Sequence, residues 1–245
     1  MAGHSKWANI KHRKAAQDAK RGKVFTKHIR EITVAAREGG GDVDMNPALR
    51  IAVDKALGAN MTRDTIERAV KRGTGDLDGV NYEDIRYEGY GPCGVAVLVE
   101  CSTDNKNRTV AEVRHAFSKY NGNMGTDGSV AYMFDKLGVI LMSEGADEDS
   151  VMDVVLDAGA DDVITHDDGS IEINCAPKDY VGVISALNDA GMEMESSEIV
   201  QRAANEIALS DDDSEKVMKL IDALEDLDDV QDVFTNADFP ESAFA

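Results

Sequence analysis

The chain has 245 residues, of which 42% are hydrophobic and 30% are charged, and its formal net charge is −21 at pH 7. This hydrophobic content is enough for packed cores and excludes a chain that is disordered throughout, and the length suits two or three modules better than one core. No apolar run approaches the roughly 18 residues that a membrane-spanning helix needs, and the first residues lack the apolar centre of a secretory signal. We therefore expect a cytoplasmic protein without a membrane partner.

The charge is distributed unevenly along the chain. Residues 1–37 carry ten Lys or Arg side chains and two acids, a net charge of +8, and residues 38–75 carry six of each sign. Residues 76–245 carry ten basic and 39 acidic side chains, a net charge of −29. A cationic segment attached to an anionic remainder indicates a polyanion, such as a nucleic acid, as the partner.

The basic segment has the spacing of an amphipathic helix. If residues 20–37 are helical, an apolar stripe and a basic stripe lie almost opposite each other, so the first can pack while the second faces solvent. The apolar stripe consists of Phe25, Ile29, Ile32 and Ala36. The basic stripe consists of Lys20, Lys23, Lys27 and Arg30. Such a stripe suits contact with phosphates, which attract cations without demanding a sequence.

The predicted nucleic-acid contacts form two clusters. The N-terminal cluster consists of Lys6, Lys11, Arg13, Lys14, Lys20, Arg21, Lys23, Lys27 and Arg30. The second cluster consists of Arg63, Arg68, Lys71 and Arg72. Part of the second cluster is expected to form local ion pairs with Asp64 and Glu67, because side chains three or four residues apart meet on a helix.

Residues 1–78 are predicted to form an all-helical domain. Asn46 is placed to cap a helix that has Pro47 at its first position. Asp64 and Glu67 have the spacing of a capping box with Asp64 as the cap, which predicts a further helix.

Two later loops resemble ligand sites only in part. Gly89–Gly94 matches the glycine pattern of dinucleotide-binding proteins, but that site needs a helix directly after it, and a strand follows here. Pro92 also removes an amide donor, so we predict a hairpin turn and no cofactor. The loop Asn121–Ser129 alternates Asn and Asp like a calcium loop, but Tyr132 stands where such a loop needs a glutamate. We predict a glycine-rich surface loop.

The loop before the predicted helix at residue 106 has two interpretations. Asn105, Lys106, Asn107 and Arg108 combine free helix amides with two cations and could receive an anion or a partner. Capping of the helix by Asp104 or Asn105 explains the same residues equally well.

The pattern from residue 130 to 199 is β-α-β-β-α-β, the split βαβ arrangement of ferredoxin-like domains. The strand, helix and closing strand that follow lack partners of their own but complement residues 82–121. The sequence therefore predicts an α+β fold, with an N-terminal all-helical domain (1–78) followed by two α/β domains. The ferredoxin-like domain (130–199) is inserted into the other (79–129 and 200–245).

No catalytic or metal-binding chemistry is indicated. The cysteines lack metal-ligand spacing, and the acidic clusters lie at helix starts and turns, where they cap helices and keep the protein soluble. The histidines, none of which belongs to a nucleophile or metal motif, are His4, His12, His28, His115 and His166. We predict no catalytic residue, no metal and no cofactor.

Motifs along nearly the whole chain resemble the YebC family. They are Met1–Trp7, Lys20–Lys27, Asn46–Arg50, Tyr87–Pro92, Thr103–His115, Gly128–Tyr132 and Val233–Asn236. Thr62, where many members have proline, and Gln201–Glu206, where a proline-containing stretch is expected, depart from the pattern. The resemblance implies a helical N-terminal domain and two α/β domains around a cleft, and no catalytic residues. The family's basic N-terminal positions match Lys6, Lys11, Arg13, Lys14, Lys20, Arg21, Lys23 and Lys27 here.

YebC-like proteins are catalogued as probable DNA-binding transcriptional regulators of the bacterial cytoplasm. A mitochondrial relative activates translation of a cytochrome oxidase subunit, and bacterial members are linked to stalled ribosomes. The resemblance therefore implies a non-enzymatic, nucleic-acid-binding regulator of gene expression, or a translation factor that binds the ribosome. The sequence lacks a convincing helix-turn-helix, zinc spacing and an aromatic RNA-stacking motif, which favours recognition of backbone and shape in either DNA or ribosomal RNA.

Two further questions stay open at this level. The acidic domains have either of two roles, binding basic proteins such as those of the ribosome or keeping the chain soluble. The oligomeric state is not determined by the sequence.

Overall fold

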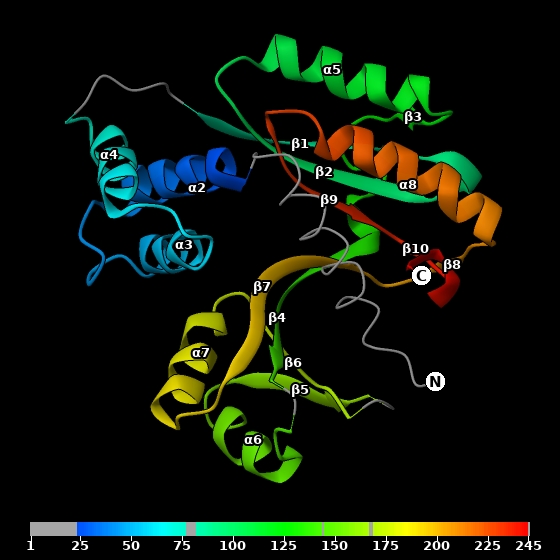
Figure 1. The fold of residues 1–245 in the computed structure, drawn as a ribbon. Coiled ribbons are helices and arrows are strands. Elements are labelled where there is room, and N and C mark those ends of the chain that lie inside the picture. Colours follow the sequence, from blue (N-terminus) through cyan, green and yellow to red (C-terminus); the bar gives the residue numbers. More distant parts are fainter. Residues whose placement is uncertain (1–23, 77–81, 144, 167–168, 245) are drawn as a thin grey trace.

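The structure, a computed structural model, describes residues 24–76, 82–143, 145–166 and 169–244. Three helices come first, and two four-stranded sheets with their own helices follow (Figure 1). The predicted α+β class, with N-terminal helices before the sheet-containing parts, is confirmed.

The N-terminal helices form a small bundle with its own core. They are α2 (Val24–Gly39), α3 (Pro47–Gly58) and α4 (Arg63–Thr74). Ile32 of α2 and Leu49 of α3 are completely buried between them. Asn46 caps α3 as predicted, because its side chain accepts a hydrogen bond from the Leu49 amide at 3.1 Å, and Pro47 occupies the first helical position, where no amide is needed.

The start of α4 differs from the prediction. Its cap is Thr62, whose hydroxyl accepts from the Thr65 amide at 3.4 Å, and Asp64 lies inside the first turn. The prediction of Asp64 as the cap is wrong because a hydroxyl two residues earlier takes this role. Asp64 still faces the positive end of the helix dipole, where a carboxylate is favourable.

The backbones of α4 and α2 approach each other closely. The Thr33 hydroxyl oxygen of α2 lies 3.3 Å from the Ala69 carbonyl oxygen of α4. A Cβ atom added to Gly73 would lie 2.4 Å from the Thr33 carbonyl oxygen and 2.7 Å from the Ala36 Cβ. Gly73 is therefore required by the distance between the two helices.

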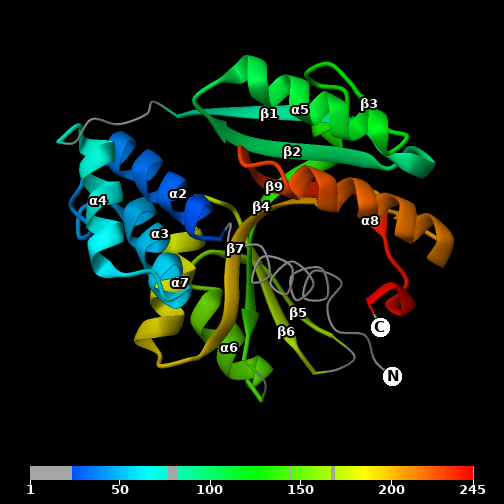
Figure 2. The same cartoon turned by 45° about the horizontal axis from the view of Figure 1, so that its top comes forward.

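The first sheet has the strand order β3-β1-β2-β9, and all its neighbouring strands are antiparallel. Its strands are β1 (Glu83–Tyr90), β2 (Ala96–Thr103), β3 (Asn123–Met124) and β9 (Val230–Thr235). The helices α5 (Lys106–Lys119) and α8 (Asp211–Glu225) cover one face of it (Figure 2).

Strand β2 is buried on both faces. Val97 and Val99 belong to the core under α5 and α8, whereas Ala96 and Leu98 pack on the opposite side with Phe134. This double burial explains why the strand is an uninterrupted apolar run in the sequence. The predicted hairpin turn before it is confirmed and contains the short helix η1 (Pro92–Gly94).

The second sheet is ferredoxin-like. Its elements are β4 (Phe134–Met142), α6 (Glu148–Val155), β5 (Ala160–Thr165), β6 (Ile171–Cys175), α7 (Tyr180–Asp189) and β7 (Met194–Ala203). The strand order is β5-β6-β4-β7 with antiparallel neighbours, and α6 and α7 pack on the same face. This is the predicted split βαβ arrangement.

The chain leaves the first sheet after β3 and returns to it at β9, so the second sheet is inserted into the first unit. Strand β7 continues to Ala203, past residue 199, where the sequence analysis ended the inserted domain. The exact domain ranges stay a prediction. The remaining short elements are η2 (Ala131–Met133), β8 (Ile207–Ala208), β10 (Ala237–Asp238) and η3 (Glu241–Phe244).

Adding one methyl group at Gly73 tests the close contact between α2 and α4. We expect Gly73→Ala to lower the free energy of unfolding by about 1–3 kcal/mol, because the helices must separate to accept the added carbon. Urea denaturation followed by circular dichroism measures this change. The control is Gly58→Ala at the end of α3, where an added Cβ meets no atom within 4 Å. A Gly73→Ala protein as stable as the wild type would contradict the close approach.

Candidate nucleic-acid interface

The predicted cationic surface is only partly within the described residues. Lys6, Lys11, Arg13, Lys14, Lys20, Arg21 and Lys23 lie outside them. The remaining candidates belong to α2, α4 and the start of α5.

The basic stripe was predicted to face solvent, but its two described members, Lys27 and Arg30, turn toward the rest of the protein. Arg30 is only 7% exposed, and Lys27 is half-buried, because both side chains point toward the first sheet. The Lys27 Nζ donates to the Gln231 carbonyl at 2.9 Å. Phe25, predicted to pack, is 47% exposed. Ile29, Ile32 and Ala36 pack as predicted, but the prediction that Arg30 faces outward is wrong because the acidic body covers that side of the helix.

The second basic cluster, on α4, is accessible. Arg63, Arg68, Lys71 and Arg72 are all exposed. Arg68 forms the predicted local ion pair with Asp64, at 2.5 Å. Ala69 and Gly73 turn toward α2, so the cluster lies on the outer side of the bundle.

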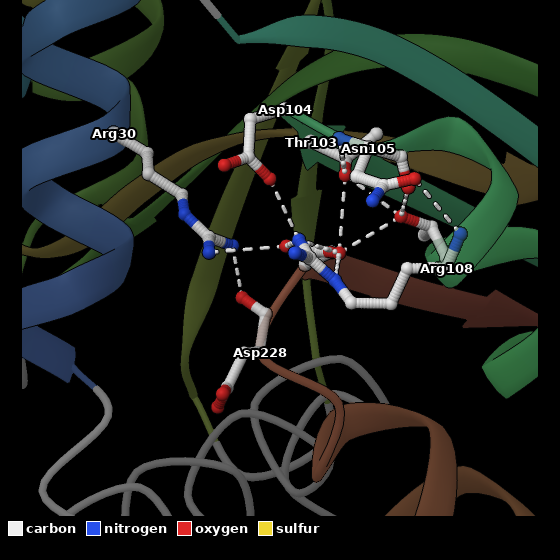
Figure 3. Close-up of polar contacts among 8 residues, drawn as sticks. Arg30, Thr103, Asp104, Asn105, Arg108 and Asp228 are labelled. Carbon is white, nitrogen blue, oxygen red and sulfur yellow. Dashed lines mark hydrogen bonds and ion pairs between the residues drawn. The ribbon is translucent and has the colours of Figure 1, made fainter. Parts of the chain in front are cut away.

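A buried carboxylate joins α2 to the first sheet (Figure 3). Asp229 has no solvent-exposed surface and lies directly before β9. Its Oδ1 accepts from the Arg30 Nη2 at 3.1 Å, and Arg108 of α5 donates to it through Nε at 3.1 Å and through Nη2 at 2.7 Å. The hydroxyls of Thr103 and Thr109 donate to Oδ2 at 3.1 and 2.8 Å. We call this set the Asp229 cluster.

The Asp229 cluster favours the ionised carboxylate. Burial raises the pKa of Asp229, but the hydrogen bonds from Arg108, Thr109 and Thr103 outweigh it, so the pKa lies below its ordinary value of 3.8. The hydrogen bonds of Arg108 to Asp229 and Asp104 raise its own pKa. A cluster held this way is ionic at neutral pH.

The loop at the start of α5 is used internally. Asn105 caps the helix by accepting from the Arg108 amide at 3.1 Å, which is the capping alternative of the sequence analysis. Arg108 pairs with Asp229 and Asp104, and Lys106 pairs with Glu83 at 2.5 Å. Both cations of the predicted anion loop therefore already have carboxylate partners within the chain, and Asn107 is exposed beside them.

A second buried carboxylate fixes the glycine-rich surface loop. Glu88 of β1 is 5% exposed and accepts from the amides of Gly128, Val130 and Ala131, each at 2.8 Å. Burial raises the pKa of Glu88, and these three bonds outweigh it, so the pKa lies below 4.5. The loop thereby presents Tyr132, which is 76% exposed.

The three described histidines lie in different parts of the fold. His28 pairs with Glu31 at 3.1 Å, His115 is exposed, and the His166 Nε2 lies 3.6 Å from Glu172. In the described part of the chain, no group of three or more His, Cys, Asp or Glu side chains could hold a metal ion. None of the helices described there is long and apolar enough to cross a membrane.

Neither Asp229 nor Glu88 was identified from the sequence. Asp229 is one of 39 acidic residues after position 75, and its partners lie up to 199 positions away. The spacing of Thr103, Arg108 and Thr109 is visible in the sequence, but it does not indicate which acid they share.

Known proteins resemble this chain over nearly its whole length. Residues 5–76 match the TACO1/YebC protein N-terminal domain, and residues 82–237 match the TACO1/YebC second and third domain. The chain is 62% identical over 237 residues to a protein of Cupriavidus taiwanensis, a match that covers 97% of this chain and 98% of that protein. It is 58% identical over 245 residues to a protein of Nitrosococcus oceani, covering 100% and 99%. Both relatives are named probable transcriptional regulatory protein.

The fold is also found in a solved structure, of a conserved hypothetical protein from Aquifex aeolicus. That protein is 42% identical and superposes with a TM-score of 0.80 over 91% of this chain and 93% of the other. A helical bundle followed by two α/β units, one of them ferredoxin-like, defines the class of protein. The chain belongs to the TACO1/YebC family, as the motif resemblance predicted.

The Asp229 cluster predicts that the folded protein loses stability in acid. Because the folded pKa of Asp229 is lowered, its stabilisation is complete above the ordinary value of 3.8 and is lost as the pH falls through the folded pKa. We expect Asp229→Asn to cost about 3 kcal/mol at neutral pH, because two arginines lose their carboxylate, and to make stability less dependent on pH below 4. Denaturation curves between pH 7 and pH 2.5, about the range over which carboxyls titrate, measure both effects.

Asp104→Asn is the matched control. Asp104 also pairs with Arg108, at 2.8 Å, but its side chain is 37% exposed. We expect this change to cost less than about 1 kcal/mol. Equal losses for the two variants would show that Asp229 is no more important than a surface partner.

The Glu88 contacts predict a fixed loop. In Glu88→Gln an amide donor replaces one acceptor, so at least one buried loop N–H loses its partner, and we expect a loss of about 1–3 kcal/mol. Amide hydrogen exchange at Gly128, Val130 and Ala131 should become faster. Asp127→Asn, an exposed change in the same loop, is the control and should leave exchange unchanged. Unchanged exchange in Glu88→Gln would be the contrary result.

Proposed function

We propose that the protein is a non-enzymatic, nucleic-acid-binding regulator of gene expression that contacts phosphate backbones through its N-terminal helical part. The observation that carries this proposal is the division of charge: residues 1–75 have a net charge of +8 and residues 76–245 have −29. A polyanion is repelled by the second part and attracted by the first. The names of the two bacterial relatives support a regulatory role.

Helix α4 supplies the accessible described part of the proposed surface. Arg63, Lys71 and Arg72 are exposed, and in the described part of the chain they form no ion pair. Asp64 and Glu67 lie on the same helix, and their negative charge opposes deep insertion of α4 into a groove lined with phosphates. Contact with the outer backbone is therefore the binding mode that this face favours. The cations of residues 1–23 add to the positive charge of this part of the chain.

A ribosome-binding translation factor is the second candidate. Helix α4 offers arginines, which can contact either guanine or phosphate, and no Asn or Gln, the side chains that pair with adenine in the major groove. Recognition of backbone alone suits structured RNA, including ribosomal RNA, as well as duplex DNA. The kind of nucleic acid that the protein retains at physiological salt distinguishes the two candidate functions.

Removal of charge from α4 tests the proposal. We expect the combined change Arg63→Gln, Lys71→Gln and Arg72→Gln to make the slope of log K against log salt shallower by about 2 to 3, because each cation releases roughly one counterion. The fold should be unaffected, since all three side chains are exposed. Filter binding to a DNA duplex and to an RNA duplex, at several salt concentrations, measures the slope for both.

The control removes the same number of charges from the body. Lys178, Lys216 and Lys219 are at least 58% exposed and lie on the anionic part of the chain. Their replacement with Gln should leave the slope unchanged. If the α4 variant keeps the wild-type slope on both duplexes, α4 is not the contact surface.

A further inference from the structure

The basic side of α2 is occupied by a segment of the protein's own chain. Lys27 donates to the Gln231 carbonyl at 2.9 Å, and Arg30 donates to the Asp228 carbonyl and, at 3.1 Å, to the Asp229 carboxylate. All of these acceptors are oxygens, and one carries a full negative charge. Phosphate oxygens offer the same chemistry to Lys and Arg. The segment 228–231 therefore presents to α2 what a phosphate backbone would present.

Asp229 does not depend on Arg30. Arg108 donates to both carboxylate oxygens, with Nη2 at 2.9 Å from Oδ1 and 2.7 Å from Oδ2. Thr103 and Thr109 add hydroxyl donors from the same unit. If Arg30 leaves, its bonds to Asp228 and Asp229 are lost, but Arg108 still neutralises the charge of Asp229.

Arg30 is incompletely paired in its present position. A guanidinium has five N–H donors, and its Nε is buried and finds no hydrogen-bond partner in the described part of the chain. The group also lies 5.2 Å from the centre of the Tyr82 ring. A polyanion that received Arg30 would satisfy donors that the contact with the sheet leaves unused. Both sides of this contact can therefore separate without leaving a buried charge alone.

A single connection joins the bundle to the sheets. The chain passes once from the bundle to the sheets, between Thr74 and Glu83. Residues 76–245 carry a net charge of −29, so a polyanion bound to α2 at its present distance from the body would be repelled. Movement of the bundle away from the sheets would relieve that repulsion.

We propose that the segment 228–231 is an internal substitute for phosphate, which holds Lys27 and Arg30 until a polyanion displaces it and the bundle leaves the first sheet. This inference rests on the proposed function, because it assumes that the helical part binds polyanions. It adds a consequence that the proposed function alone does not have: binding changes the distance between the bundle and the sheets.

Energy transfer between two dyes on the full-length chain measures that distance. Cys93, exposed beside β2, accepts one dye. Cys101 and Cys175 are buried, and burial raises the pKa of their thiols to about 12 and about 11, so they react slowly. Met45→Cys, at a position that is 78% exposed between α2 and α3, accepts the second dye.

The labelled protein is titrated with long-chain inorganic polyphosphate, with a short DNA duplex and with a short RNA duplex, while binding is followed separately by gel shift. We expect transfer efficiency to fall in proportion to the bound fraction. In Arg30→Gln it should already be lower than in the wild type before any polyanion is added, although Lys27 and the packing of Ile51 against the second sheet remain. Arg37→Gln removes an exposed arginine of the same helix and should keep the wild-type efficiency.

The outcomes separate this inference from the proposed function. Binding without a change in transfer efficiency overturns the inference and leaves the proposed function intact. A wild-type efficiency in Arg30→Gln also overturns it, provided that circular dichroism shows an intact bundle. If none of the three polyanions binds, both the inference and the proposed function are wrong.

Discussion

A single buried carboxylate joins parts of this chain that are far apart in sequence. Asp229 accepts hydrogen bonds from α2, from the end of β2 and from the first turn of α5, and it lies at the entry to β9. A buried charge is stable only with such partners. The position of α2 against the first sheet, the start of α5 and the return of the chain from the inserted sheet therefore all depend on one set of ionic contacts.

Short sequence patterns predicted much of the fold, because the helix starts, turns and strands that they indicate depend on neighbouring residues. The alternation and turn signals of residues 130–199 gave the split βαβ order, and Asn46 followed by Pro47 gave the start of α3. The start of α4 was less predictable, since Thr62 and Asp64 are both acceptable caps and the sequence does not distinguish them. Errors of this kind move a boundary by two residues and leave the fold unchanged.

The candidate site was harder to predict, because exposure depends on neighbours that are distant in sequence. Periodicity correctly placed Ile29, Ile32 and Ala36 on the packed side of α2, but it cannot show that a second unit buries Arg30 or that Phe25 stays exposed. The cations of α4 stayed exposed because small residues, Ala69 and Gly73, face α2 instead. Lys27 and Arg30 of α2 therefore contact the chain itself, whereas the cations of α4 lie on the surface.

The place of β9 in the first sheet has a consequence for how the protein is made. Strand β2 ends at Thr103, and its neighbour β9 begins at Val230, after the whole ferredoxin-like unit. On the ribosome, the inserted unit can complete its own hydrogen bonds while β2 still has an open apolar edge. Asp229, too, is translated long after Arg30 and Arg108. The first sheet therefore closes last during biosynthesis, and its half-finished form is the stage at which a nascent chain is most exposed to aggregation.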